Sequence, residues 1–381
     1  MARIRVAGVT CMRFSRWMTR IFAVALFAVM VCGGVSADGL KTQNVIFVMT
    51  DGLRWQEVFH GADAALINKE NGVNDEAAFR KNFWRDDQSA RREAAMPFLW
   101  DVVAKNGQIF GNRDLGSSAR VTNPYWFSYP GYSETFCGFV DLAMNSNNLV
   151  ENPNETVFEW LSKKPAYKNK VAAFGAWEAI TYIINRDRAG FPVYSGLAPV
   201  TNGKISPKQD LLNHLKAETT GFTEEESPDS ITFYSALEYL KQNKPRVFYI
   251  SLGWTDETAH AGRYDEYIKA AHLADNYLRI LWETVQSMPQ YKGKTTLIFT
   301  CDHGRGAEGA DWRSHGSGIP GSNQNWMAFM GPDTPALGER KNADEVSANR
   351  IAATLAALLG EDYNAAVPKA GSPIKDVLPS R

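Results

Sequence analysis

The sequence predicts a three-layer α/β/α sandwich built around a mostly parallel β-sheet. Two observations support this prediction. Short runs rich in β-branched and aromatic residues alternate along the chain with segments whose apolar residues recur at helical spacing. The runs are apolar throughout, which is typical of parallel strands buried on both faces. Such alternation is typical of folds in which helices cover both faces of a sheet.

Individual elements follow from the same pattern. Apolar runs predict strands at residues 44–49, 109–110, 171–174, 246–252, 295–300 and 326–330. Helical spacing predicts helices at residues 96–106, 156–161, 177–184, 231–242, 264–285 and 347–359. The stretches around 54–92 and 185–230 lack such regularity, and we interpret them as insertions into a single domain that covers residues 38–381.

Residues 1–37 differ in composition from the rest of the chain. Five arginines are their only charged residues, an apolar run covers residues 21–31, and small residues precede position 38. This is the pattern of a secretory signal peptide, and the apolar run is too short for a good transmembrane span. We expect cleavage after Ala37 and a periplasmic or secreted protein without a stable membrane span. An uncleaved N-terminal anchor and lipid attachment at Cys32 are the alternatives.

Charge and cysteine content argue against two broad classes of protein. Without residues 1–37 the chain has 36 basic and 42 acidic residues, which is a net charge of −6. This balance argues against a general nucleic-acid-binding protein. Only Cys137 and Cys301 remain in that part of the chain, too few for a disulfide scaffold, and we expect both to be buried free thiols. The oligomeric state does not follow from these features.

Three predicted strands are followed by residues that can bind a divalent metal ion. The strands at 44–49, 246–252 and 295–300 lead into Asp51, Asp256 with His260, and Asp302 with His303. In open α/β sheets the working crevice lies beyond the carboxyl ends of the strands. An Asp and a His four residues apart at the start of a helix face the same side and can bind one ion. A later His-Gly pair adds the imidazole of His315. Each motif taken alone is as easily a solvated turn.

A candidate nucleophile lies in the hydroxyl-rich segment 120–139. Ser128 stands just before a sharp Pro-Gly break, where a helix can begin. The free backbone N–H groups at such a helix start can bind a phosphate oxygen. An aromatic-rich loop with Ser and Thr as turn residues is the alternative interpretation. Thr122 is a rival nucleophile, because Thr122-Asn123-Pro124 has the same spacing to a proline.

Together these motifs resemble the alkaline phosphatase superfamily, in particular its phosphodiesterase/nucleotide-pyrophosphatase-like and sulfatase-like branches. The resemblance covers roughly the whole chain after residue 37, with the motifs in the right order. The matching motifs are Asp51 after the first strand, Asp-x-x-x-His at 256–260, Asp-His-Gly at 302–304 and His-Gly at 315–316. The run Ser128-Tyr129-Pro130-Gly131-Tyr132, with Gly138 ten residues after Ser128, resembles the nucleophile segment of the pyrophosphatase branch.

The resemblance implies an alkaline-phosphatase-like fold and an exported two-metal hydrolase of small-molecule phosphate esters. It assigns one metal to Asp51, Ser128, Asp302 and His303, and the other to Asp256, His260 and His315. Nitrogen and oxygen ligands suit Zn²⁺, with Mn²⁺ or another divalent ion as the alternative. Two such ions can hold the attacking and leaving oxygens of an in-line displacement, with Ser128 forming a phosphoseryl intermediate. Candidates for lining the substrate pocket are Tyr129, Gly131, Tyr132, Trp254 and Arg305.

Two departures from the family pattern keep rival functions open. Gly131 stands where the pyrophosphatase branch has an Asn that donates to a phosphate oxygen. The residues after Ser128 also lack the Arg of the sulfatase motif x-Pro-x-Arg, which formylglycine formation needs. The rivals are a phosphodiesterase, a sulfatase or a phosphonate hydrolase on the same scaffold, and a non-catalytic binding protein that retains the fold.

Overall fold

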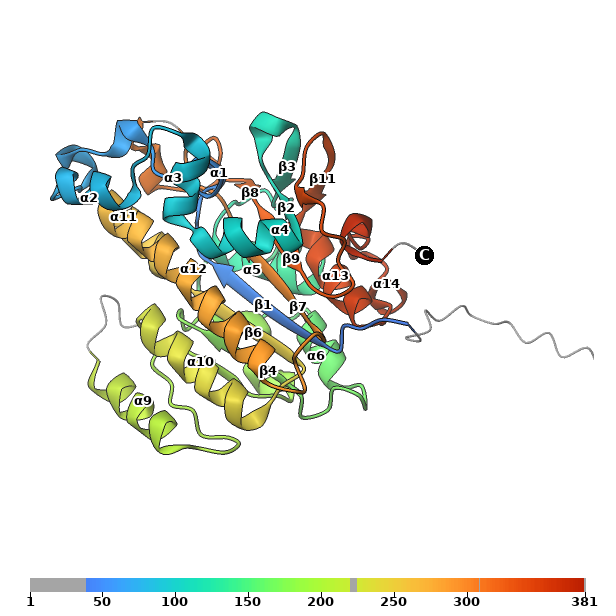
Figure 1. Ribbon diagram of the computed structural model, residues 1–381. Helices are drawn as coiled ribbons and strands as arrows, with labels where there is room; N and C mark the ends of the chain where they lie inside the picture. The colour runs from blue at the N-terminus through green and yellow to red at the C-terminus, as the bar shows by residue number, and fades with distance from the viewer. Residues whose placement is uncertain (1–38, 220–224, 308, 380–381) are drawn as a thin grey trace, which may run out of the picture. The chain divides into compact units, whose positions relative to one another are not determined.

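A computed structural model describes residues 39–219, 225–307 and 309–379, so the expected signal peptide lies outside the described residues. Within them, an eight-stranded sheet has the order β10-β2-β9-β7-β1-β6-β4-β5 (Figure 1). Its strands are β1 (Asn44–Thr50), β2 (Gly107–Phe110), β4 (Val171–Gly175), β5 (Val193–Ser195), β6 (Val247–Leu252), β7 (Thr295–Cys301), β9 (Met327–Met330) and β10 (Gly338–Glu339). Only the pairings of β9 with β2 and β7 are antiparallel. The predicted mostly parallel sheet is confirmed.

The strands β7, β1 and β6 are neighbours in the middle of the sheet and end level with one another. Thr50 pairs with Leu252 on one side and with Cys301 on the other. Every residue of the three strands is buried, which explains their continuous apolar runs. The residue that follows each strand is therefore brought to the same edge of the sheet.

Helices cover both faces of the sheet, which confirms the predicted three layers. Along β1, Ile46 and Val48 face one apolar cluster, whereas Val45 and Phe47 face the other. The first cluster contains the buried sides of α10 (Asp229–Asn243) and α12 (Tyr264–Ser287), which lie across that face in Figure 1. The second contains those of α5 (Ser128–Cys137), α6 (Val157–Ser162), α7 (Ile180–Ile184) and α13 (Ile351–Leu358).

The two irregular stretches contain short helices, and one of these was not expected. The first stretch forms α1 (Trp55–His60), α2 (Glu76–Phe83) and α3 (Gln88–Ala95). The second forms α8 (Arg186–Ala189), β5 and the twelve-residue helix α9 (Pro207–Glu218). The hydroxyl of Ser206 caps α9 by accepting from the N–H of Gln209, and Pro207 occupies its first turn. This proline starts the helix rather than interrupting the chain.

Two other predicted helices differ in detail. The segment expected as a helix at 96–106 contains the π-helical turn η3 (Leu99–Val103) followed by α4 (Ala104–Asn106). The helix expected from residue 347 begins later, because β11 (Ala343–Ser347) comes first and forms a small sheet with β3 (Ser117–Arg120) and β8 (Gln324–Asn325). The shorter elements are η1 (Ala64–Leu66), η2 (Lys69–Asn71), η4 (Arg113–Leu115), η5 (Gly309–Arg313), η6 (Ala348–Arg350), α14 (Tyr363–Ala366) and η7 (Lys375–Val377).

In the described part of the chain, no helix is both long enough and apolar enough to cross a membrane. Cys137 and Cys301 are buried free thiols, as predicted.

Helix α5 passes very close to the turn that follows β7. A Cβ atom on Gly131 would lie 2.5 Å from the carbonyl oxygen of Asp302, closer than real Cβ contacts come. The glycine that departs from the family pattern is therefore a packing requirement of this chain, because a side chain at this position would push α5 away from the strand end.

Gly131→Ala is expected to destabilise the protein by about 1–3 kcal/mol, the usual cost of overpacking a tight contact. Urea denaturation followed by circular dichroism measures the free energy of unfolding. Gly318→Ala is the matched control, since Gly318 is exposed and a Cβ there would meet no atom within 4 Å. Equal unfolding free energies for the two variants would contradict the packing argument.

Candidate metal centre

The first group of possible metal ligands forms where β1 and β7 end. Asp51, Asp302 and His303 are buried and place donor atoms within 4.8 Å of one another. His303 Nε2 lies 3.3 Å from Asp51 Oδ1 and 3.3 Å from Asp302 Oδ2. Ser128 Oγ lies 3.3 Å from His303 Nε2 and 3.4 Å from Asp51 Oδ1. The structure thus brings together the four residues that the resemblance assigns to one metal.

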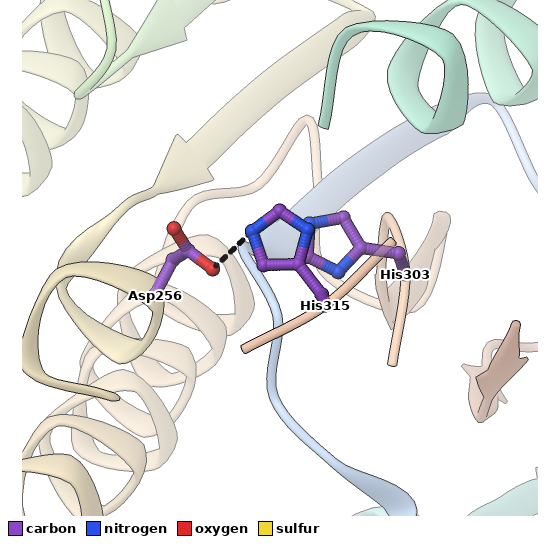
Figure 2. Close-up of side chains that lie close together, drawn as sticks. All are labelled: Asp256, His303 and His315. Atoms are coloured by element: carbon purple, nitrogen blue, oxygen red, sulfur yellow. Dashed lines mark ion pairs between the residues drawn. The ribbon is translucent and has the colours of Figure 1, made fainter. Parts of the chain in front are cut away.

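The second group surrounds helix α11 (Trp254–His260), which follows β6. His260 Nε2 lies 3.2 Å from Asp256 Oδ2 and 2.9 Å from His315 Nε2. Figure 2 shows the contact of Asp256 with His315, in which Oδ1 and Nε2 lie 3.6 Å apart, and the His315 ring stacks on that of His303 at a centroid distance of 4.1 Å. Asp256, His303 and His315 also place donor atoms within 4.8 Å of one another. The two groups share His303 and form one connected centre.

Two atoms of this centre lack the partners that buried polar atoms need. Asp302 Oδ2 and His315 Nδ1 are buried and have no hydrogen-bond partner among the described residues. Because buried polar groups are nearly always paired, these observations fit a centre that binds a cation. The nitrogen and oxygen donors suit Zn²⁺ or Mn²⁺.

Burial sets the protonation states of the centre. Burial, reinforced by the charge of Asp256, raises the pKa of Asp51 to about 7, and burial beside Asp51 raises that of Asp302 well above its usual range. Burial lowers the pKa of His303 to about 4 and that of His315 to about 3. The imidazoles are therefore neutral and able to bind metal near neutral pH, whereas the buried carboxyl groups need a nearby positive charge to ionise.

Solved structures with little sequence identity share this fold. Alkaline phosphatase PafA matches with a TM-score of 0.55 at 10% identity, over 89% of this chain and 99% of that chain. A 2-O GAG sulfatase matches with a TM-score of 0.52 at 14% identity, over 88% of this chain and 74% of that chain. The chain has the fold of the alkaline phosphatase superfamily. The lipoteichoic acid synthase LtaP from Listeria monocytogenes also matches, with a TM-score of 0.51 at 14% identity, over 84% of this chain and 72% of that chain.

Comparison of sequences finds less similarity than comparison of structures. No protein-family model matches the chain. A curated relative, GPI ethanolamine phosphate transferase 1 from Aspergillus oryzae (strain ATCC 42149 / RIB 40), is 33% identical over 87 residues. The match covers 22% of this chain and 8% of that protein, so the chain spans less than a tenth of that relative's length.

A buried polar network, which the sequence analysis does not predict, holds the loops that carry the centre. Arg54 forms an ion pair with Glu57 and donates from Nη1 to the carbonyl of Gly306 at 2.9 Å. Tyr267 OH accepts from the N–H of Arg54 at 2.9 Å and donates to the carbonyl of Gly52 at 3.3 Å. The network joins the loops after β1 and β7 to helix α12 and so fixes their relative positions.

A separate carboxylate holds the start of α11. Asp229 is buried and accepts from the N–H groups of Gly253 at 2.8 Å and Trp254 at 3.2 Å. Thr255 Oγ1 donates to the carbonyl of Asp51 at 2.5 Å. The helix that carries Asp256 is thereby tied both to α10 and to the strand end that carries Asp51.

Helix α5 begins at Ser128, which agrees with the helix start rather than with the alternative of an aromatic-rich loop, but it offers few free backbone donors. Pro130 has no N–H, and Tyr129 donates its N–H to Asn147 Oδ1 at 3.0 Å. Gly131 donates its N–H to the carbonyl of Phe127 at 3.1 Å. The open cradle of N–H groups expected for a phosphate oxygen is therefore largely closed by these contacts.

The loop that leads into α5 is held by the buried carboxylate of Glu134. This group accepts from the N–H of Thr122 at 2.8 Å, from its hydroxyl at 2.7 Å and from the N–H of Asn123 at 2.8 Å. Asn123 Oδ1 in turn accepts from the N–H groups of Tyr125 and Trp126 at 3.0 Å each. Trp126 has a φ of 58°, a conformation that bulky residues rarely adopt. Glu134 therefore sets the path by which the chain enters the helix.

The rival nucleophile and the residues expected to line the substrate pocket differ in what their side chains contact. Thr122, the rival nucleophile, directs its hydroxyl to Glu134, and Tyr129 is buried with its hydroxyl donating to the carbonyl of Val150 at 2.5 Å. Tyr132 OH donates to Asp51 Oδ2 at 3.2 Å and so orients a candidate ligand. Contact of substrate with the half-buried Trp254, with Gly131 or with Arg305 stays a prediction.

Glu134→Gln is expected to lower the free energy of unfolding by about 1–3 kcal/mol, because the new amide N–H₂ group faces backbone donors and leaves some of them unpaired. Urea denaturation checks this. Glu345→Gln is the control, since Glu345 is about half exposed and pairs with Arg120 at the surface. An equal loss of stability in both variants would contradict the role of Glu134 as a buried clamp.

Zinc binding to the metal-free protein is expected to release one more proton at about pH 6 than at about pH 8, because it displaces the proton of the Asp51 carboxyl. The Asp51 pKa of about 7 means that its carboxyl is mostly protonated at about pH 6 and mostly ionised at about pH 8. Since a bound ion needs the carboxylate, the apparent affinity should fall as the pH falls below about 7. Calorimetric titrations in buffers of different ionisation enthalpy count the released protons. Equal counts at both pH values would contradict the raised pKa, and Asp51→Asn should abolish the difference.

Proposed function

We propose that the chain is an exported, metal-dependent hydrolase of phosphate esters with Ser128 as its nucleophile. The observation that supports this most directly is the position of Ser128 Oγ, 3.3 Å from His303 Nε2 and 3.4 Å from Asp51 Oδ1 at the start of α5. A hydroxyl beside carboxylate and imidazole ligands has the surroundings of a metal-activated nucleophile. The fold shared with a phosphatase and a sulfatase supports the same class of chemistry.

The proposed cofactors are two divalent ions, with Zn²⁺ as the first choice. One would be held by Asp51, Ser128, Asp302 and His303, and the other by Asp256, His260 and His315. When bound, the ions would lower the pKa of the serine hydroxyl and stabilise negative charge on the attacking and leaving oxygens. The unpartnered atoms Asp302 Oδ2 and His315 Nδ1 support this use of the centre.

The reaction proceeds in two displacements at phosphorus. Ser128 Oγ loses its proton to solvent and attacks the phosphorus atom. A bond from Oγ to phosphorus forms while the bond to the alcohol oxygen breaks, and the alcohol leaves with a proton taken from water. A water molecule then attacks the same phosphorus, the bond to Oγ breaks, and Oγ regains a proton. The sum converts an ester and one water into an alcohol and a phosphate.

The residues around Ser128 serve to position the attacking oxygen. Asp51 and His303 contact Oγ directly, and Tyr132 fixes Asp51 from the side of α5. The clamp formed by Glu134 and Asn123 fixes the loop before the helix. Because effective attack needs the oxygen in line with the leaving group, rigid support of this kind contributes directly to the rate.

Transfer of the phosphoryl group to an alcohol is a second candidate function. The local match to GPI ethanolamine phosphate transferase 1 favours it, since that relative is by its name a transferase. The same phosphoseryl intermediate would serve, with an alcohol in place of water as the second nucleophile. Sulfatase activity is disfavoured because the residues after Ser128 lack the arginine that formylglycine formation needs.

The test is a hydrolysis panel on zinc-loaded protein that contains an aryl phosphate monoester, a bis-aryl phosphate diester, an aryl phosphonate and an aryl sulfate. A phosphate ester should be the preferred substrate, and Ser128→Ala should lower its turnover by about 10³-fold or more, as expected for loss of a nucleophile. Adding an alcohol acceptor and measuring its phosphorylated product separates transfer from hydrolysis.

Thr122→Val is the matched variant for the rival nucleophile and should keep most of the turnover. Turnover that survives in Ser128→Ala but collapses in Thr122→Val would move the nucleophile to Thr122. Preference for the sulfate would overturn the choice of phosphate esters, and inactivity on the whole panel with zinc bound would favour the binding-protein alternative.

A further inference from the structure

A permanent positive charge lies inside the proposed metal centre. The guanidinium of Arg305 is buried and forms an ion pair with Asp256 through Nη1 and Oδ1. Asp256 is the only carboxylate among the three residues of the second group. Burial by itself would raise the pKa of Asp256, but the charge of Arg305 and the hydrogen bond with His260 outweigh it and hold that pKa well below its usual range. The second group is therefore already neutralised by a residue of the chain.

Arg305 is held in this place by contacts that do not depend on Asp256. Its Nε donates to the carbonyl of Trp312 at 2.8 Å, and its Nη2 donates to the carbonyl of Arg313 at 2.6 Å. Gly52 leaves the space that the pair needs, since a Cβ there would lie 2.7 Å from both Arg305 Nη1 and Asp256 Oδ1. Arg305 therefore has a fixed position in the centre, because each nitrogen of its guanidinium is hydrogen-bonded and its side chain is buried.

The two groups of ligands consequently differ in charge. Asp51 and Asp302 bring two negative charges to the first group when ionised, which balances a divalent ion. Asp256 brings one negative charge to the second group, and the permanent positive charge of Arg305, which is paired with it, offsets that charge. A divalent ion in the second group thus finds its one carboxylate ligand already paired and lies close to a like charge, which weakens its binding in a buried site.

We propose that Arg305 makes the centre unequal, with one tight divalent-metal site at Asp51, Asp302, His303 and Ser128 and one weak site at Asp256, His260 and His315. This inference rests on the proposed function only in taking the centre to bind metal. At limiting metal the protein then holds a single ion, and the Arg305 guanidinium supplies positive charge where the second ion would lie. In this arrangement Arg305 determines metal affinity.

The test is titration of the metal-free protein with Co²⁺, followed by its visible absorption and by metal analysis after dialysis. The wild-type protein should bind cobalt in two phases whose dissociation constants differ by about tenfold or more, since the charge of Arg305 repels an ion in the second group only at close range. Asp302→Asn should weaken the tight phase, and His260→Ala should remove the weak phase. Two phases of equal affinity in the wild-type protein would overturn the inference.

Arg305→Gln removes the charge while keeping a polar side chain, and it should tighten the weak phase by about tenfold or more, because the like charge beside the ion is gone. Arg305→Lys is the matched control, because it keeps the charge and should leave the two affinities unequal. If the weak phase tightened in neither variant, with both variants folded by circular dichroism, the role of Arg305 would be overturned.

If Arg305→Gln fails to fold, the assignment of the weak phase through His260→Ala still decides whether the two sites differ in affinity. If the protein bound no cobalt at all, the proposed function itself would be contradicted. If it hydrolysed phosphate esters normally but bound cobalt with equal affinity at both sites, only the present inference would be contradicted.

Discussion

The site depends on one constraint, the common register of β7, β1 and β6. Parallel strands that end level with one another deliver Asp51, Gly253 and Asp302 to one edge of the sheet. Because the side chains on a strand alternate between faces, a shift of one residue in this register would turn the ligands away from each other and expose the buried apolar runs. The same packing that stabilises the middle of the sheet therefore assembles the centre.

Assembly of the centre brings like charges together in a buried place, and the surrounding residues offset this cost. The raised pKa values of Asp51 and Asp302 show that burial disfavours their ionised forms. The ion pair of Arg54 with Glu57, the hydroxyl of Tyr267 and the carboxylate of Asp229 hold the three loops in place without adding ligands. Arg305 differs from them because it contacts a ligand directly and changes the charge of the centre.

The sequence predicts the fold well because the buried strands and long helices carry strong periodic signals. It also predicts the convergence of Asp51, Asp256 and Asp302, since each follows a strand of a parallel sheet. It could not predict the roles of Arg54, Glu134 and Asn123, because these polar residues gain their partners only through tertiary contacts. Helix α9 was missed for a different reason. The prolines around it suggested irregular chain, although a proline after Ser206 is also a good helix start.

We propose that Ser128 and the side chains at these strand ends together hold a catalytic metal. Anomalous diffraction at the zinc edge, from crystals of the protein grown with zinc, tests it most directly. We expect an anomalous peak with Asp51, Asp302, His303 and Ser128 Oγ all in direct coordination. A zinc peak that excludes Ser128 Oγ, or a protein that binds no zinc at these residues, would rule out the proposed metal site.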